Sequence, residues 1–480
     1  MRAKDTNCEG SHAVRIEYTD KPVSGWGGLI LAARFFDGLR LREWLGRAVP
    51  DGRRSNNRIP VVDQVLSLFC TVLTGGRRFS HVERMRTDEV IRGILGVERI
   101  PSSTSLTRYF GGFVRSQVEH LSEVLGRLVL GRMAPFAGGE VLDLDSTVFE
   151  RYGEQEGSLK GHNPRKHGRP SHHPILAMLA NSRRILHAWL RSGNTGTARG
   201  VTAFLTECLA RLPEGFAVGA VRADSGFFVH EFLEELERLS LDYAIAVRVN
   251  PLVRKFVLRI SNWRVFGEGL EVGETLYEVP SWKRPRRLVV VREEVRKRPK
   301  ARGRELFEMP DYKIHVVMTS LSIPGEEVWR FYNGRADSEN RLKELTYDFG
   351  ADGFCLDSFD GAEAVFRLIC FLYNLMADFK ETVLGDAARQ LGTVRHHVFV
   401  TGAILGQDGR RKVLRLGLRG KWRTRFASWL RRTALSKIPT ATHPDQTPEI
   451  LHLGPQRPWR SRPTRIDPCT LLTIDPTSPY

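Results

Sequence analysis

Apolar residues in the first third of the chain repeat at helical spacing. They recur every three or four positions at Val62, Val65, Leu66, Phe69 and Leu73, a spacing that places side chains on one face of a helix. The serine and threonine run at residues 102–105 is typical of a helix start, because such side chains cap free backbone N–H groups. We therefore expect residues 1–137 to form a helical N-terminal domain.

From residue 138 the pattern becomes that of strands. Alternating or continuous apolar runs occupy residues 141–149, 173–180 and 184–191, separated by Gly, Asn and Pro, as expected of strands between turns. A further apolar run at 216–222 precedes a turn and then a helical repeat at Val229, Phe232, Leu233 and Leu236. This order of strand, turn and helix predicts the first part of an α/β domain at residues 138–249.

The second half of the chain predicts an insertion and then a return to the α/β domain. Residues 262–310 alternate β-favouring runs with Gly, Pro and basic clusters, so we assign residues 250–311 to a β-rich insertion. A strand at 312–319 and a Pro-free helix at 326–345 follow, and an apolar helix is expected at 362–380. We assign residues 312–405 to the second part of the α/β domain.

The C-terminal part, residues 406–480, differs in composition. Residues 410–437 contain eleven basic residues and no acidic one, a pattern typical of a surface that binds polyanions. Beyond Ile438 the chain is rich in Pro, Thr and Ser, which predicts a poorly ordered tail.

The whole chain is strongly basic. Its 480 residues include 73 Lys and Arg against 55 Asp and Glu, a formal net charge of +18. Such an excess favours a polyanionic partner through phosphate neutralisation and counterion release. Nucleic acid is therefore the expected partner, and the helical N-terminal domain and the basic C-terminal segment are the expected binding parts.

Membrane association and a secreted location are not expected. The best apolar runs, 61–73 and 366–376, fall short of the roughly 20 residues that cross a bilayer, so both predict buried helices. The N-terminus has neither the apolar core nor the cleavage site of a secretory signal, which predicts a cytoplasmic protein. The six cysteines lack C-x-x-C pairing, so neither a zinc site nor a disulfide framework is indicated.

Three acidic motifs are candidates for chemistry, and the first lies at 141–147. Asp143 and Asp145 alternate with Leu142 and Leu144, so a strand here would carry both carboxylates on one face. Two carboxylates on a central strand are costly unless a cation or hydrogen-bond donors compensate, which makes this a candidate metal site. An exposed edge strand with an aspartate capping the turn explains the motif equally well.

The second motif is Asp224, which stands where an apolar strand gives way to Ser-Gly and a helix. Ligand sites collect at such strand ends in α/β sheets. A helix N-cap is the alternative, because Asp is common in that role.

The third motif is a stripe on the helix expected at 326–345. Tyr332, Arg335, Glu339 and Lys343 are three or four positions apart and would share one helix face. Such a stripe can bind metal and phosphate together. The alternative is a solvated helix with Arg335–Glu339 and Glu339–Lys343 ion pairs.

In this order, LDLDST, RADSGF and Y-x-x-R-x-x-x-E resemble the DDE transposases of bacterial insertion sequences, which have an RNase H-like catalytic domain. The segments YGEQEGSLKGHNP, HHPILAML and LRSGNTGTARG, together with GRRFSHVERMRTDEVIRGILG and IPSSTSLTRYF, are similar to the DDE-domain group 1 subgroup. The resemblance thus covers roughly residues 15–400. It implies an α/β fold: a mixed sheet flanked by helices, with a β-rich insertion between the second and third acids.

The resemblance also implies the site. Asp145, Asp224 and Glu339 would be the catalytic, metal-binding residues, and Asp145 is preferred to Asp143 because the family motif places the acid directly before Ser-Thr. Two Mg²⁺ ions, which Mn²⁺ can replace, would be bridged by Asp145 and completed by Asp224 and Glu339, since hard cations prefer carboxylate oxygens.

Basic and aromatic residues of the third motif would hold phosphates near the cut. The residues implied are Tyr332, Arg335 and Lys343. Relatives often carry a lysine seven positions after the glutamate, where this chain has Thr346. Lys343 lies one turn earlier on the same face, so its charge is expected to replace the missing lysine.

The expected function is cut-and-paste transposition at the bacterial nucleoid, with DNA cleaved at the element ends and joined to target DNA. The partners would be double-stranded terminal inverted repeats and target DNA, and synapsis of two ends implies at least a homodimer. A metal-dependent nuclease without strand transfer and a decayed transposase that only binds DNA are the alternatives. Further phosphate contacts are expected from Arg410, Arg411, Lys412 and Arg415.

The histidine and tryptophan clusters allow two interpretations each. His162, His167, His172 and His173 lie in a loop without paired Cys, which favours DNA contact or solvent exposure over zinc. Trp263 and Trp282 lie in the insertion, where they would either stack on a base beside the cut or pack in the core.

Overall fold

The N-terminal region is a bundle of short helices. The computed structural model describes residues 18–51, 57–161, 163, 166–295 and 312–435, so His162 and the tail beyond Ile438 lie outside the described residues. The helices of this region are α1 (Leu29–Gly38), α2 (Leu41–Ala48), α3 (Val61–Leu73), α4 (Glu89–Leu95), α5 (Ser103–Phe110) and α6 (Arg115–Leu130). α3 is the expected buried helix. Ser102 caps α5 by accepting a hydrogen bond from the backbone N–H of Ser105.

A nine-stranded mixed sheet forms the centre of the molecule, in the order β10-β11-β12-β13-β9-β8-β2-β6-β7. β2 is antiparallel to β6 and parallel to β8, and β8 is parallel to β9. The expected α/β fold with a mixed sheet is therefore confirmed. The strands are β2 (Glu140–Ser146), β6 (Ile175–Leu179), β7 (Arg184–Trp189), β8 (Val218–Ala223), β9 (Asp242–Ala246), β10 (Arg264–Gly267), β11 (Leu270–Tyr277), β12 (Arg286–Glu294) and β13 (Tyr312–Thr319).

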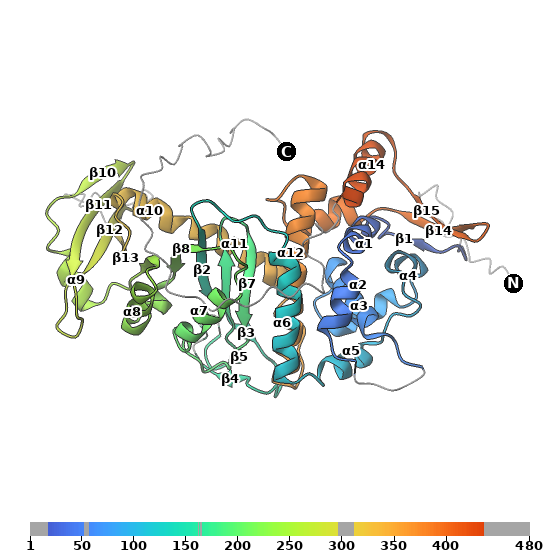
Figure 1. The fold of residues 1–480 in the computed structure, drawn as a ribbon, viewed down its shortest axis with the longest axis horizontal. Coiled ribbons are helices and arrows are strands. Elements are labelled where there is room, and N and C mark those ends of the chain that lie inside the picture. Colours follow the sequence, from blue (N-terminus) through green and yellow to red (C-terminus); the bar gives the residue numbers. More distant parts are fainter. Residues whose placement is uncertain (1–17, 52–56, 162, 164–165, 296–311, 436–480) are drawn as a thin grey trace, which may run out of the picture.

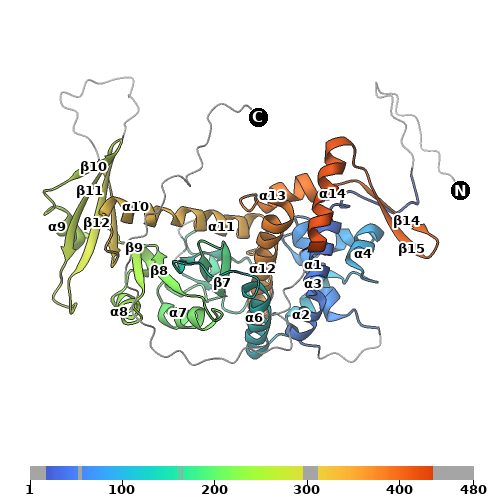
Figure 2. The same ribbon diagram turned by 45° about the horizontal axis from the view of Figure 1, so that its top comes forward.

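Helices cover both faces of this sheet. Leu142 and Leu144 of β2 share a buried cluster with α7 (Val201–Ala210) and α8 (His230–Arg238) on one face. The opposite face is covered by α10 (Gly325–Asn333) and α11 (Arg335–Tyr347), which run nearly end to end across the sheet in Figure 2. The single helix expected at 326–345 is thus two helices that meet at Gly334.

The insertion is not a separate sheet. It begins with a helix, α9 (Pro251–Val257), which precedes its strands. β10, β11 and β12 then pair in sequence, and β12 joins β13, which pairs with β9 of the central sheet. The insertion strands therefore extend the central sheet at one edge.

The long apolar helix α12 (Phe359–Phe379) links the sheet to the N-terminal helices. Nearly all of its residues are buried, as expected for the apolar run it contains. Asn374 accepts a hydrogen bond from the Ile185 N–H and donates one to the Ile185 carbonyl, both at 2.8 Å. These bonds satisfy backbone groups on the edge strand β7, which would otherwise be buried without partners.

The C-terminal elements return to the N-terminal region. β1 (Val23–Ser24) pairs with β14 (Ala403–Asp408), which forms a hairpin with β15 (Arg411–Leu416). α14 (Gly420–Leu435) lies beside α1 in Figure 1. Among the described helices, none has the length and apolar character needed to span a membrane.

Candidate active site

The first two acids lie at one end of two neighbouring parallel strands. Asp143 of β2 stands opposite Arg222 of β8, and Leu144 stands opposite Ala223. Asp145 follows Leu144 on β2, and Asp224 directly follows Ala223, the last residue of β8, so the two aspartates lie at the same end of these neighbouring strands. Alternation places these four polar residues on one face and the leucines on the other.

Asp145 is buried beside other acids. Only 8% of the residue is exposed, and the Ser146 N–H donates to its Oδ1 at 2.8 Å. Burial raises the pKa of its carboxyl from the ordinary 3.8 to about 6; the charges of Asp224 and Glu339 add to the rise, while the Arg335 guanidinium opposes it. The three carboxylates expected from the sequence therefore share one electrostatic environment.

Arg335 connects two of these carboxylates. Its Nη2 lies 3.0 Å from Asp145 Oδ1, and its Nη1 donates to Glu339 Oε1 at 2.5 Å. The Arg335–Glu339 pair considered from the sequence is thus present, yet the arginine is buried rather than solvated. Its Nε is also buried and has no acceptor among the described residues, which leaves a donor for a further oxygen.

Asp224 has the N-cap role considered for it. Its Oδ1 accepts from the Gly226 N–H at 2.9 Å and so caps a short turn over Ser225–Phe227. The residue is half-buried, and its charge reaches both Asp145 and Tyr332. A capping contact to one oxygen leaves the other available for a ligand.

Asp143 has a different environment from Asp145, although both point to the same face. It is 1% exposed, and Arg222 donates to its two oxygens from Nε and Nη2 at 2.6 and 2.7 Å. The Ser338 hydroxyl of α11 also donates to Asp143. Its oxygens are thus held by protein donors, whereas Asp145 faces the other acids.

The remaining residues of the stripe differ in exposure. Tyr332 is half-buried, and burial raises the pKa of its hydroxyl, with the nearby acids adding to the rise. Lys343 is exposed, and within the described ranges it makes no ion pair with Glu339. Thr346, at the position where relatives carry lysine, donates its hydroxyl to the Leu342 carbonyl of its own helix.

A loop between β7 and α7, residues 192–200, also borders the site, although the sequence patterns assigned it no role. The Ser146 hydroxyl lies 3.5 Å from that of Thr197, and a side chain at Gly226 would collide with Thr197. The buried Arg191 donates to the carbonyls of Thr197 and Arg199 at 3.0 Å each. The signal was available in the SGNTGT composition directly after a strand, which is typical of a ligand-facing loop.

The described histidines and tryptophans of the two clusters differ in burial. His172 and His173 are buried, and His167 is exposed. Trp263 and Trp282 are partly buried against the apolar cluster that β2 shares with α7 and α8. The Trp282 ring stacks on that of His230, with 4.9 Å between their centroids, and the Arg286 guanidinium lies over Trp282. These contacts favour the packing interpretation of the tryptophans.

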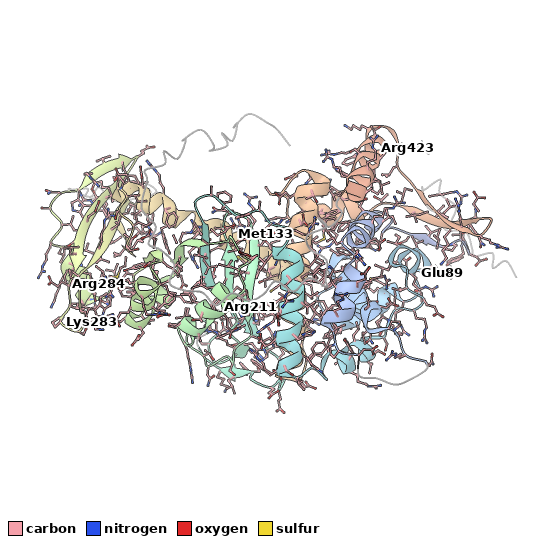
Figure 3. All side chains as sticks on the ribbon, in the orientation of Figure 1. Glu89, Met133, Arg211, Lys283, Arg284 and Arg423 are labelled. Atoms are coloured by element: carbon pink, nitrogen blue, oxygen red, sulfur yellow. The ribbon has the colours of Figure 1, made fainter. Side chains whose placement is uncertain are left out.

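The basic C-terminal residues lie far along the molecule from the acids. Arg410, at the turn, and Arg411, Lys412 and Arg415 of β15 are all exposed on the hairpin, which projects at the right of Figure 1. Figure 3 shows Arg423 of α14 on the same part of the molecule, with Lys283 and Arg284 at the opposite end. The latter two pair with Glu234 and Glu237, which reduces their attraction for a polyanion.

The donor set suits a hard divalent cation. Burial, together with the charges of Asp224 and Glu339, disfavours ionisation of Asp145, as its raised pKa shows. In this conformation Arg335 spans two of these three carboxylates, and within the described ranges no three His, Cys, Asp or Glu side chains are close enough to hold an ion together. The oxygen donors and the unbalanced charge nevertheless fit a hard divalent cation better than a soft metal.

The mixed sheet carries two aspartates at the ends of adjacent strands, and a glutamate lies on the helix that crosses them, an arrangement that suits an α/β enzyme acting on phosphodiesters with divalent metal. The chain matches the family model of the transposase DDE domain, group 1, over residues 7–438. It belongs to this family and is therefore a DDE transposase, an enzyme of cut-and-paste transposition that acts on DNA; the family uses divalent metals.

Similarity to solved structures is more distant. A piggyBac transposase in a synaptic complex with hairpin DNA is similar in structure, at 12% sequence identity and a TM-score of 0.40; the match covers 79% of this chain and 82% of that one. No curated protein matches the chain in sequence.

Proposed function

We propose that this transposase uses Asp145, Asp224 and Glu339 to cut DNA at the ends of its own element and to join the freed 3′ hydroxyls to target DNA. The observation that supports the assignment is the shared environment of the three carboxylates, which come from β2, the end of β8 and α11. Asp143 is a poorer choice because Arg222 and Ser338 occupy its oxygens.

The proposed cofactor is a pair of Mg²⁺ ions, replaceable by Mn²⁺, which would activate the attacking hydroxyl and stabilise the leaving oxygen. Asp145 would serve both ions, with Asp224 and Glu339 serving one each. Arg335 has a buried Nε without an acceptor among the described residues, so it is the strongest candidate to hold a phosphate oxygen. Tyr332 and Lys343 on the same stripe would assist it.

The proposed partners are the terminal inverted repeats and target DNA at the bacterial nucleoid. Exposed cations of the β14–β15 hairpin would contact phosphates away from the cut, since such contacts position a protein on DNA. Two ends must be held together for transposition, so a homodimer is the smallest assembly proposed.

The test separates binding from chemistry. Asp145→Asn, Asp224→Asn and Glu339→Gln should each abolish Mg²⁺-dependent cleavage of an end-containing duplex, because metal ligands act on the chemical step. End binding in a gel-shift assay should remain, because distant cations supply most of the affinity. Glu327→Gln, which alters an exposed acid on α10, is the control and should cut normally.

Two outcomes would overturn parts of this proposal. Normal cleavage by Asp145→Asn would show that the first acid is assigned wrongly. Cleavage by the unaltered protein without any joined product, in the presence of target DNA, would instead indicate a nuclease without strand transfer.

A further inference from the structure

A second polar network lies beneath the three acids. Asp143 is its centre, with both oxygens held by Arg222 of β8 at 2.6 and 2.7 Å and one of them also by the Ser338 hydroxyl of α11. Asp143 and Ser338 are each 1% exposed, and Arg222 is 6% exposed. Three separate elements therefore meet on one buried carboxylate.

Each member of the network stands next to a proposed catalytic residue. Asp143 is two residues before Asp145 on β2, and Arg222 is two residues before Asp224 on β8. Ser338 directly precedes Glu339 on α11. The network thus links the three backbones that carry the acids.

Arg222 extends the connection to α10. Its Nη1 donates to the Phe331 carbonyl at 2.6 Å, one residue before Tyr332, and its guanidinium lies 5.1 Å from the Phe331 ring centroid. A side chain at Gly334 would collide with Arg222 Nη1. The glycine between α10 and α11 therefore gives the guanidinium the room it needs.

The stability of the fold does not by itself explain why Asp143 and Arg222 form a buried ion pair. A buried ion pair is often no better for stability than apolar side chains of similar volume, because both charges lose water. The hydrogen bonds, unlike apolar contacts, fix the distances and the relative orientation of β2, β8 and α11. Catalysis by positioned groups is sensitive to displacements of about 1 Å, so fixed distances between these elements matter for the acids.

We propose that Asp143 is a positioning residue that holds Asp145, Asp224 and Glu339 in register through Arg222 and Ser338. The inference rests on the proposed function, because it concerns the same three acids. Asp143 itself touches neither metal nor DNA in this assignment. Its charge is neutralised by Arg222, which leaves the site's negative charge to the other three carboxylates.

Ser338→Ala is the mildest test, because it frees α11 from Asp143 while the Arg222 contacts remain. We expect roughly ten-fold slower single-turnover cleavage, the order of loss that a slightly misplaced group causes. Binding of Mn²⁺, followed by electron paramagnetic resonance in the absence of DNA, should weaken several-fold, while end binding and the thermal midpoint stay near those of the unaltered protein. Ser67→Ala removes another buried helical hydroxyl, one bonded within α3, and should change neither cleavage nor Mn²⁺ binding.

Asp143→Asn tests the centre of the network. It should weaken Mn²⁺ binding and cleavage more than Ser338→Ala does. Glu363→Gln is the matched control. Glu363 of α12 is also a buried carboxylate, but it is held by Arg367 of the same helix and by Arg115 of α6, and neither helix carries a proposed catalytic residue. If Asp143→Asn does not fold, the Ser338→Ala result decides alone.

The outcomes separate the two proposals. Failure of Asp145→Asn to affect cleavage would overturn the proposed function. If cleavage depends on Asp145 but Ser338→Ala binds Mn²⁺ and cuts like the unaltered protein, the positioning role is wrong. The positioning role would also be overturned if Ser338→Ala lost cleavage only at temperatures at which it unfolds and bound Mn²⁺ normally below them.

Discussion

At the scale of single residues, the candidate site concentrates negative charge, and this charge lowers the stability of the folded protein. Asp145 is buried close to two other carboxylates, and the Arg335 guanidinium offsets only part of their repulsion. Residues that bind ions commonly carry such a cost in the ion-free protein, since the charge is needed for function rather than for stability.

This cost predicts that Asp145→Asn stabilises the metal-free protein. The pKa of Asp145 is about 6 in the folded protein against an ordinary 3.8, so the folded state binds this proton more tightly than the unfolded state. Ionisation therefore removes stability as pH rises from about 4 to 6, and above pH 6 the full penalty is roughly 3 kcal/mol. At pH 8 with a chelator, the variant should unfold a few degrees higher in calorimetry.

The same variant should lose its advantage at about pH 3 and below, where Asp145 is protonated in both the folded and the unfolded state. Glu327→Gln, at an exposed position, is the control and should shift the midpoint equally at both pH values. A lower midpoint for Asp145→Asn at pH 8 would mean that the Arg335 ion pair outweighs the cost of burial.

At the scale of secondary-structure elements, α11 presents residues of unlike exposure along one stripe. Arg335 at its first position is buried against Asp145, Glu339 is half-exposed, and Lys343 is exposed. The buried end of the stripe faces the acids, so the exposed end is free to meet DNA that lies across the site. Gly334, between α10 and α11, has no side chain that would collide with the Arg222 guanidinium.

This arrangement predicts a catalytic effect at Lys343. Lys343→Ala should slow single-turnover cleavage by roughly ten- to a thousand-fold, the cost of one electrostatic donor near the transition state, with little change in end binding. Adding Thr346→Lys to that variant should restore part of the rate, because position 346 lies on the neighbouring part of the same helix face. Lys255→Ala, at an exposed position on α9, is the control. Undiminished cleavage by Lys343→Ala would leave Arg335 as the phosphate-holding residue.

At the scale of the whole molecule, the first and the last elements of the described residues form one unit. β1 pairs with β14, and α14 packs beside α1, so the basic C-terminal elements are anchored on the N-terminal helices. In Figure 1 this unit lies at the opposite side of the sheet from the insertion strands. A DNA end contacted by both the hairpin and the acids would therefore have to extend along the molecule.

The hairpin cations predict the salt dependence of end binding. Replacing Arg410, Arg411, Lys412 and Arg415 by Gln should lower the slope of log affinity against log salt concentration by about 0.9 for each phosphate that is no longer neutralised, up to ~3.6. The control replaces four arginines that already pair with glutamates three or four positions away, the exposed Arg40, Arg86 and Arg238 and the half-buried Arg127. An equal slope for both variants would assign the hairpin to a solvated surface.

Many helices and strands were predictable because the spacing of apolar and polar residues within each of them indicates its type. The apolar spacing in 61–73 and 366–376 predicted buried helices, and the alternation around Asp143 and Asp145 predicted a strand with one acidic face. The order of the acidic motifs indicated the family that the match over residues 7–438 confirms. Such patterns can be detected in a sequence because neighbouring residues share one helix or strand.

Contacts between distant residues could only be decided by the tertiary structure. Alternation places Asp143 and Asp145 on the same face, and only the approach of β8 and α11 gives one carboxylate to Arg222 and Ser338 and leaves the other beside Asp224 and Glu339. The pairing of β13 with β9, which merges the insertion with the central sheet, joins segments about seventy residues apart in sequence. The return of β14 to β1 joins segments about 380 residues apart in sequence. No local pattern encodes these choices, because each depends on which surfaces remain to be buried once the separate elements have formed.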